Sequence, residues 1–166
     1  MKRALALAMS LVALACSSPD PEAKAPDPGV APSGAEFYPV ALVLVDRCGS
    51  IDCHGSKYRN MRLYGFGSQR FDPRHRPATP ETTQLEADQN YNAVAALEPD
   101  IFRRVIAEGG ADPERLTFVR KSRGRENHKG GTRVTPGDDA DRCIQSWLQS
   151  SVDADACRRA VPRLNQ

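Results

Sequence analysis

The stretch of residues 47–55 constrains the fold of this chain more than any other. Its sequence, Arg-Cys-Gly-Ser-Ile-Asp-Cys-His-Gly, holds two of the five cysteines and one of the three histidines. Four residues separate Cys48 from Cys53, and His54 follows the second cysteine directly. The fold must therefore bring two sulfur atoms and one imidazole into a small volume, either as a joint binding site or as a covalent loop.

Two chemistries fit this spacing. In the Cys-x-x-Cys-His pattern that attaches a c-type haem, the thiols form thioethers to the porphyrin vinyl groups and the adjacent imidazole binds the iron. The additional residues in this chain can be looped out if Cys53 stays next to His54. This interpretation predicts Cys48 and Cys53 as attachment points and His54 as the proximal ligand. The alternative is a disulfide loop between the two cysteines, with a surface histidine.

Residues 1–36 have the composition of an export signal followed by a tether. A basic start, a short apolar run and small residues lead to Cys16, as in a bacterial lipoprotein signal, although Ala13 stands where leucine is usual. We therefore expect residues 1–15 to be removed, Cys16 to be lipidated, and the proline-rich residues 16–36 to tether a domain of residues 37–166 to a membrane. This would place the protein in the bacterial cell envelope, lipid-anchored at the periplasmic or outer-membrane face. The alternative is an ordinary secreted protein cut nearby.

Export changes the meaning of the net charge and of the cysteine count. Removal of Lys2 and Arg3 from the 23 basic residues leaves 21, equal to the 21 acidic residues, so the formal charge of +2 does not argue for nucleic-acid binding.

Disulfides persist in an oxidising compartment. A disulfide between Cys143 and Cys157 would close a loop of about 15 residues, worth about 3 kcal/mol in the loop-entropy model. The alternatives are cross-pairing with the motif cysteines and a reactive dithiol.

The hydrophobic pattern predicts an all-α fold, a small helical domain with long loops. Five segments show helical periodicity: residues 37–48, 81–96, 99–108, 138–149 and 153–159. Two segments lack periodicity and are expected to be loops: residues 55–80 and 111–137. The run 40–45 would also suit a strand. The second helix is expected to start at Thr79-Pro80 and to turn Leu85, Val94 and Leu97 inward. Large apolar residues are scarce, so a buried porphyrin or disulfides must complete the core.

The order of these features resembles a known family. Over residues 37–149, a leading helix runs into Cys-x4-Cys-His-Gly, followed by Met61-Arg-Leu-Tyr, His128-Lys-Gly-Gly and a final helix with Cys-Ile-x-x-Trp147-Leu. This order is similar to that of the mono-haem cytochrome c-like domains of exported bacterial lipoproteins. The resemblance implies a covalently bound haem c, with the first and last helices packed against each other beside it.

The chain departs from the family at the iron ligands. The attachment spacing is longer, and the usual distal ligand is a methionine far downstream. Met61 lies only seven residues beyond His54, too close to reach across the iron, and is expected to fill the core. His128 is the better distal candidate, because the two glycines beside it permit close backbone approach to a flat ligand. Without it the iron would be five-coordinate or differently ligated. His75, in a polar loop between prolines, is expected to be solvated.

The leading hypothesis is therefore an exported haem-binding lipoprotein for electron transfer or haem-based sensing. Its expected partners are haem, the membrane that holds its lipid and a redox protein. The basic cluster at residues 120–129 either neutralises haem propionates or faces an acidic redox partner, unless it is a solvated loop. An electron carrier is favoured over an enzyme. A peroxidase would need an open distal site with a base beside it, and no part of the sequence clearly supplies one. The alternative is a haem-free, disulfide-stapled interaction module of the cell envelope.

Overall fold

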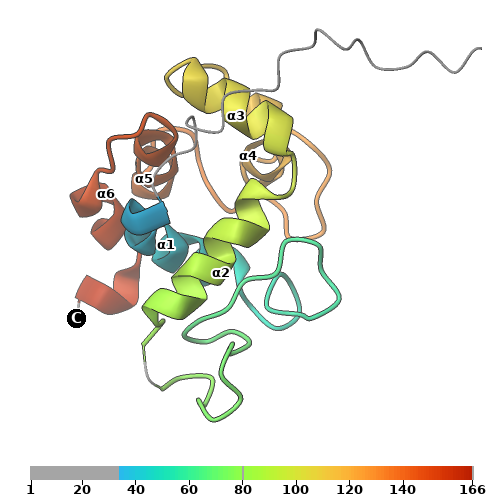
Figure 1. Ribbon diagram of the computed structural model, residues 1–166, viewed down its shortest axis with the longest axis vertical. Helices are drawn as coiled ribbons and strands as arrows, with labels where there is room; N and C mark the ends of the chain where they lie inside the picture. The colour runs from blue at the N-terminus through green and yellow to red at the C-terminus, as the bar shows by residue number, and fades with distance from the viewer. Residues whose placement is uncertain (1–33, 80, 166) are drawn as a thin grey trace, which may run out of the picture.

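The computed structural model describes residues 34–79 and 81–165, which form a chain of helices joined by long loops (Figure 1). The α-helices are α1 Tyr38–Cys48, α2 Gln84–Ala95, α3 Pro99–Ala107, α4 Thr117–Ser122, α5 Asp139–Leu148 and α6 Ala154–Arg159. The 3₁₀-helices are η1 Gly34–Glu36, η2 Pro113–Arg115 and η3 Pro162–Asn165. The described ranges contain isolated bridges but no strand, so the predicted all-α class is confirmed.

The N-terminal predictions cannot be compared with this structure. The signal peptide of residues 1–15, the lipidation of Cys16 and the tether as far as residue 33 lie outside the described residues. Within those ranges, no helix has the length and apolar character that crossing a bilayer requires.

Helix α1 forms the centre of the fold. Residues 40–45, Val-Ala-Leu-Val-Leu-Val, are all buried, and helices α2, α5 and α6 pack around them (Figure 1). Pro39 stands in the first turn, where its missing N–H costs no intrahelical hydrogen bond. The amide of Gly49 closes the other end on the Val45 carbonyl. A helix that is apolar on every face is stable in water only when it is covered in this way. The alternative of a strand at residues 40–45 is wrong.

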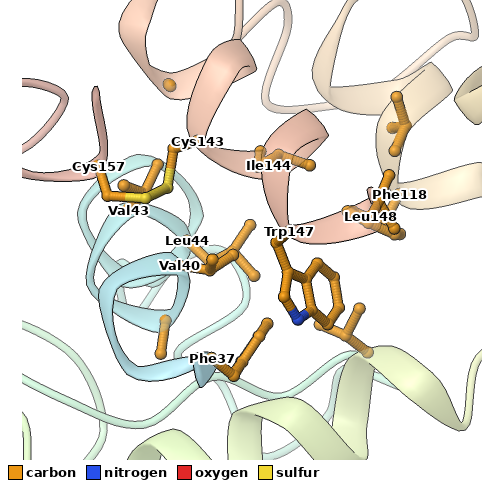
Figure 2. Packing of buried hydrophobic residues seen from close by; sticks show 14 of the residues in the cluster. Phe37, Val40, Val43, Leu44, Phe118, Cys143, Ile144, Trp147, Leu148 and Cys157 are labelled. Carbon is orange, nitrogen blue, oxygen red and sulfur yellow. A yellow bond between two sulfur atoms is a disulfide. The ribbon is translucent and has the colours of Figure 1, made fainter. Parts of the chain in front are cut away.

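An aromatic cluster joins α1 to the later helices. The Trp147 ring of α5 is fully buried, with ring-centroid distances of 4.7 Å to Phe37 and 5.5 Å to Phe102 (Figure 2). Tyr91 of α2 lies edge-on to Phe37 at 5.6 Å and to Trp147 at 6.3 Å. Such pairs contribute about 0.5–1.5 kcal/mol each beyond the burial of their area. The cluster therefore fixes α2 and α5 on the same end of α1.

A disulfide joins Cys143 of α5 to Cys157 of α6, as predicted (Figure 2). Both residues are fully buried, and their Cα atoms are 4.7 Å apart. Cross-pairing of either cysteine with the motif cysteines and the reactive dithiol are therefore wrong. Because α6 also packs against α1, the disulfide closes a three-helix unit around the apolar helix.

Helix α2 begins later than predicted, because its N-cap is Thr83 rather than Thr79. The Thr83 hydroxyl accepts a hydrogen bond from the Glu86 amide, and the Glu86 carboxylate accepts one from the Thr83 amide. This capping box satisfies two free donors at once, which a proline in the first turn cannot do. The predicted inward position of Leu85 is wrong, since 52% of that residue is exposed, whereas Val94 is buried as expected.

The segment predicted as a long loop at residues 111–137 contains helix α4. After this helix, the chain returns to the core at Val134. Phe118 of α4 and Val134 are both buried. The amides of Arg133 and Val134 donate to the Ser122 carbonyl at 2.8 and 3.0 Å. The chain after α4 therefore makes a closed excursion and returns to the end of the same helix.

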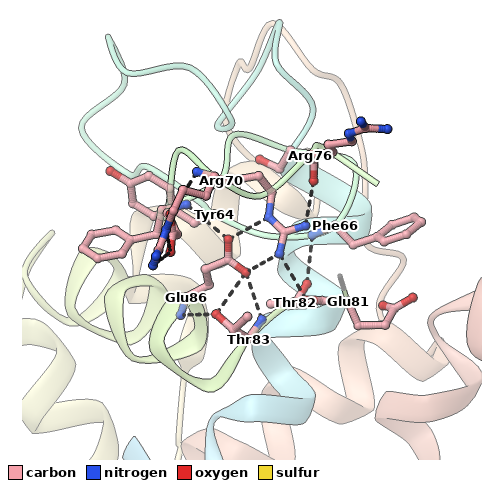
Figure 3. A network of polar contacts seen from close by, with 12 residues as sticks. Tyr64, Phe66, Arg70, Arg76, Glu81, Thr82, Thr83 and Glu86 are labelled. Carbon is pink, nitrogen blue, oxygen red and sulfur yellow. Dashed lines mark hydrogen bonds and ion pairs between the residues drawn. The ribbon is translucent and has the colours of Figure 1, made fainter. Parts of the chain in front are cut away.

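A buried ion pair holds the loop that precedes α2 against this helix (Figure 3). The side chains of Arg70 and Glu86 are 3% and 1% exposed and meet through hydrogen bonds of 2.8 and 2.9 Å. The guanidinium also donates to two loop carbonyls, and the carboxylate accepts from the amides of Phe71 and Thr83. Both charges are thus supplied with the hydrogen bonds that a buried ion pair requires.

Candidate functional site

A cavity of about 530 Å³ lies between the turn after α1 and the segment made by α4 and its following loop. Cys48, Cys53 and His54 line it from the motif, and Phe118 and His128 line it from the α4 segment. The sequence offered the motif and His128 as separate candidates, more than 70 residues apart. The fold brings Cys48, Cys53, His54 and His128 to one cavity.

The residues between the two motif cysteines form a tight turn that folds back on α1. The amides of Cys53 and Gly55 both donate to the Ser50 carbonyl at 2.9 Å, and the His54 amide donates to the Cys48 carbonyl at 3.0 Å. The intervening residues therefore loop out, while the second cysteine and the histidine return to the end of the helix. This agrees with the expectation that the additional residues of the motif loop out.

Gly55 is the residue that allows this turn to close. A β-carbon at this position would lie 2.2 Å from the Gly49 carbonyl oxygen and 2.6 Å from the Ser68 hydroxyl oxygen. Ser68 is itself buried and donates to the Leu63 carbonyl at 2.9 Å, so it is held in place. The glycine that follows Cys-His in the sequence therefore has a steric function, which the motif alone did not reveal.

The imidazole of His54 is oriented by a backbone carbonyl. Its Nδ1 lies 2.7 Å from the Met61 carbonyl oxygen, which can only accept, so Nδ1 carries the proton and Nε2 has a free lone pair. Burial lowers the pKa of His54 below its ordinary value, although the hydrogen bond to Met61 opposes this effect. The ring is therefore neutral at physiological pH. A neutral imidazole whose other nitrogen donates to a carbonyl is the usual form of a metal-binding histidine.

The second histidine lies at a distance from His54 that suits a shared metal ion. The ring centroids of His54 and His128 are 5.9 Å apart, and the ring planes are 26° from parallel. Imidazole nitrogen binds a metal at about 2.0–2.1 Å, so two imidazoles on one ion have ring centres roughly 6 Å apart. The Nδ1 of His128 also faces a backbone carbonyl, that of Gly131, at 3.4 Å. The spacing of the two rings is thus compatible with both binding one ion.

The two motif cysteines are unbridged and half-buried. Burial raises the pKa of the Cys48 thiol to about 11, against an opposite effect of the nearby Arg133 guanidinium. The thiol is therefore neutral, and buried neutral thiols are slow in disulfide exchange and oxidation. The Cys48–Cys53 disulfide of the alternative interpretation is not present in the structure.

Positive charge predominates on the walls of the cavity. The charged residues that line it are Arg59, Lys121, Lys129, Arg133 and Asp52. Lys121 is partly neutralised by Glu126 at 3.2 Å. An excess of cations around a largely apolar space favours a ligand that is apolar in its body and anionic at its edge. The contributions of Arg59 and Arg133 were missed by sequence reasoning, because neither belongs to the motif or to the predicted basic cluster.

The predicted basic cluster at residues 120–129 serves two purposes. Arg120 and Arg123 form structural ion pairs, the first with Glu126 at 3.0 Å and the second with Asp141 of α5 at 2.6 Å. These contacts hold the end of α4 in position. The lysines of the cluster line the cavity instead. The cluster is therefore only partly a solvated surface.

The described residues contain no group of three or more histidine, cysteine or acidic side chains that could hold a metal ion by themselves. Two histidines would then suffice only if another molecule supplied the remaining ligands. His75 is half-buried rather than fully solvated and does not line the cavity. Met61 is buried, as expected for a residue of the core.

Comparisons with protein families, with curated proteins and with solved structures find no match to this chain. The site is therefore interpreted from its own residues. Those residues combine two thiols, two imidazoles with ring centroids 5.9 Å apart, and a cavity with apolar walls and a basic edge.

Proposed function

We propose that this chain binds a c-type haem covalently in a cytochrome c-like domain and serves electron transfer or haem-based sensing. Cys48 and Cys53 would form the thioethers, His54 would be the proximal ligand and His128 the distal ligand. The observation that carries the proposal is the histidine pair, at 5.9 Å between ring centroids, inside the cavity that both thiols also line.

The residues of the cavity fit this group. Its volume of about 530 Å³ falls within the range of roughly 300–1,000 Å³ that is typical of small-molecule and cofactor sites. Met61, Leu97 and Phe118 supply apolar walls for the porphyrin face. Arg59 and Arg133 are suited to the propionates, because a guanidinium matches a carboxylate in geometry and charge.

The haem would supply one-electron chemistry, and the chain would supply its binding, orientation and electrostatic tuning. The Met61 carbonyl keeps His54 in the tautomer that leaves Nε2 free. The hydrogen bond from Nδ1 to this carbonyl also makes the imidazole a more basic ligand. Two imidazole ligands favour a lower reduction potential than histidine with methionine, since a thioether raises the potential. These effects suit an electron carrier better than an enzyme.

The proposal places the protein in the bacterial cell envelope. Residues 1–15 would direct export, the lipid on Cys16 would anchor the chain, and residues 16–36 would hold the haem domain away from the membrane. The basic side chains at the cavity favour a redox partner with an acidic surface, which would be attracted over a distance of about 8–10 Å at physiological salt. Intact mass measurement of membrane-extracted protein would test the lipid.

The decisive experiment is the visible absorption spectrum of the full chain, produced in a periplasm that has haem-attachment machinery. Oxidised and reduced spectra should show a Soret band and sharp reduced bands. The colour should remain with the protein after acid-acetone extraction, because thioether bonds resist it. The intact mass should increase by one haem.

The variant Cys48→Ser/Cys53→Ser should lose its haem to acid-acetone, while Cys143 and Cys157 remain bridged. A colourless native protein would refute the proposal. The mass would then distinguish free thiols at Cys48 and Cys53 from the disulfide of a haem-free interaction module, because the disulfide is two hydrogens lighter.

A further inference from the structure

The two histidines of the site are held very differently, and His54 is held firmly. Its Nδ1 is 2.7 Å from the Met61 carbonyl oxygen. Its amide donates to the Cys48 carbonyl at 3.0 Å, and its own carbonyl accepts from the Leu63 amide at 2.8 Å. Leu63 is fully buried and Cys48 ends the central helix, so His54 is fixed to the core from both sides.

His128 is held only within its own turn. Its Nδ1 lies 3.4 Å from the Gly131 carbonyl oxygen, at the outer limit of a hydrogen bond. Its carbonyl accepts from the Gly131 amide at 2.9 Å. In the described part of the chain, both hydrogen bonds of His128 therefore end on one residue three positions away. They fix the shape of the turn and leave its position against the core to other contacts.

The turn that carries His128 can move without disturbing the core. Its two ends meet at the Ser122 carbonyl, where the amides of Arg133 and Val134 are bound, and Val134 is buried there. Between these ends the chain is not helical. Ion pairs of this segment with the helices are made by Arg123 and Glu126, before the turn. Among the described residues, 127–132 make no hydrogen bond or ion pair outside their own turn, so a shift of these residues would leave those ion pairs in place. His54 has no comparable freedom.

We propose that His128 is an exchangeable ligand, and that a small neutral diatomic molecule of the carbon monoxide and nitric oxide class binds on its side of the ferrous haem. This inference rests on the proposed function. One coordination bond at His128 Nε2 breaks and one to the incoming ligand forms, with no change in oxidation state. His54 remains in place throughout. The chain would thereby act as a sensor, with displacement of the His128 turn as its response.

Carbon monoxide is the probe, added to the reduced full chain that carries its haem. The absorption change gives both the affinity and the rate. In the native protein the rate should level off at high carbon monoxide concentration, because release of His128 becomes limiting. In His128→Ala the rate should not level off. The apparent affinity should be about tenfold higher or more, because a minor open state typically makes up about a tenth or less of a protein and lowers the apparent affinity by that fraction.

Gly130→Ala provides a second variant in which the histidine is kept. A β-carbon at Gly130 would lie 2.9 Å from His128 Cε1 and 3.3 Å from its Nδ1, so the ring would have to leave its present position. Its carbon monoxide affinity should fall between those of the native protein and His128→Ala. His75→Ala is the matched control, because it removes a histidine that does not line the cavity, and should behave as native.

The outcomes separate the inference from the proposed function. Covalent haem that binds no carbon monoxide in the native chain would overturn the inference and leave the proposed function standing. Equal carbon monoxide affinities in the native protein and in both His128→Ala and Gly130→Ala would also overturn it. A protein without haem would refute the proposed function, and the inference with it.

Discussion

At the scale of single residues, the candidate site depends on backbone groups as much as on side chains. The Met61 carbonyl orients His54, and the Ser50 carbonyl closes the turn between the cysteines. Gly55 makes room for that turn. None of these contributions is visible from residue type, which is why the motif predicts the ligands but not their supports.

Replacement of Gly55 by alanine should destabilise the fold and disturb haem attachment. The new β-carbon would meet the Gly49 carbonyl oxygen at 2.2 Å, and overpacking of this kind costs about 1–3 kcal/mol. Urea unfolding would give the change in the free energy of unfolding. Gly34→Ala is the control, since its β-carbon would make an ordinary contact with the Tyr91 ring at 3.6 Å. Equal losses in both variants would contradict this account of the turn.

Replacement of Met61 by leucine should leave the iron ligation unchanged. The structure assigns the carbonyl of this residue, not its thioether, to the support of His54. A leucine keeps that carbonyl and fills a similar volume, so the stability should change by less than about 1.5 kcal/mol. The oxidised and reduced visible spectra would check this. A spectral change of the kind expected for a lost sulfur ligand would show that Met61 binds the iron.

At the scale of the elements, α2 is fixed by one acidic residue with two functions. The Glu86 carboxylate completes the capping box with Thr83 and also binds the buried Arg70 of the preceding loop (Figure 3). A single side chain thus sets the start of the helix and the position of the loop. This coupling explains why the helix begins after Thr83 although an earlier threonine and proline looked suitable.

The ion pair of Glu86 should make stability depend on pH in the acid range. Burial raises the pKa of Glu86, but hydrogen bonds from Arg70, Thr83 and Phe71 outweigh it, so the folded-state pKa lies below the ordinary value. The stabilisation is then fully present above the ordinary glutamate pKa of about 4.3 and is lost as the pH falls through the folded-state value. Urea unfolding over a pH series should show this loss.

The variant Glu86→Gln isolates the contribution of this carboxylate. At neutral pH it should be about 3 kcal/mol less stable than the native protein, because the buried charge of Arg70 then lacks the carboxylate charge that balances it. The difference between the two proteins should narrow as the pH falls. Glu36→Gln, on an exposed side chain, should show neither effect. A constant difference at every pH would contradict the assignment.

At the scale of the whole molecule, the sequence predicted the elements with strong local signals. Helix α5 has a capping aspartate and a clear apolar face. The disulfide between α5 and α6 was the favoured pairing of the four cysteines that remain when Cys16 is assigned to lipidation. Helix α4 was missed because six residues are too few for periodicity to emerge. Leu85 was placed inward because its exposure depends on where α2 starts.

The candidate site was predictable in its members and not in its geometry. Cys48, Cys53 and His54 stand in one motif, and His128 was suggested by its isolation and its glycines. The cations Arg59 and Arg133 reach the cavity from segments without a pattern. Contacts between segments far apart in sequence depend on how the helices pack, and composition and spacing contain no information on that packing.

The disulfide between α5 and α6 should contribute measurably to the stability of the whole domain. Its cysteines are 14 residues apart, and closing a loop of this length is worth about 3 kcal/mol in the loop-entropy model. Cys143→Ala/Cys157→Ala should therefore unfold at lower urea concentration than the native protein, with further loss from the buried sulfur atoms. A reducing agent should destabilise the native protein and leave the double variant unaffected. If reduction left the native unfolding curve unchanged, α6 would be held to the core by its packing alone.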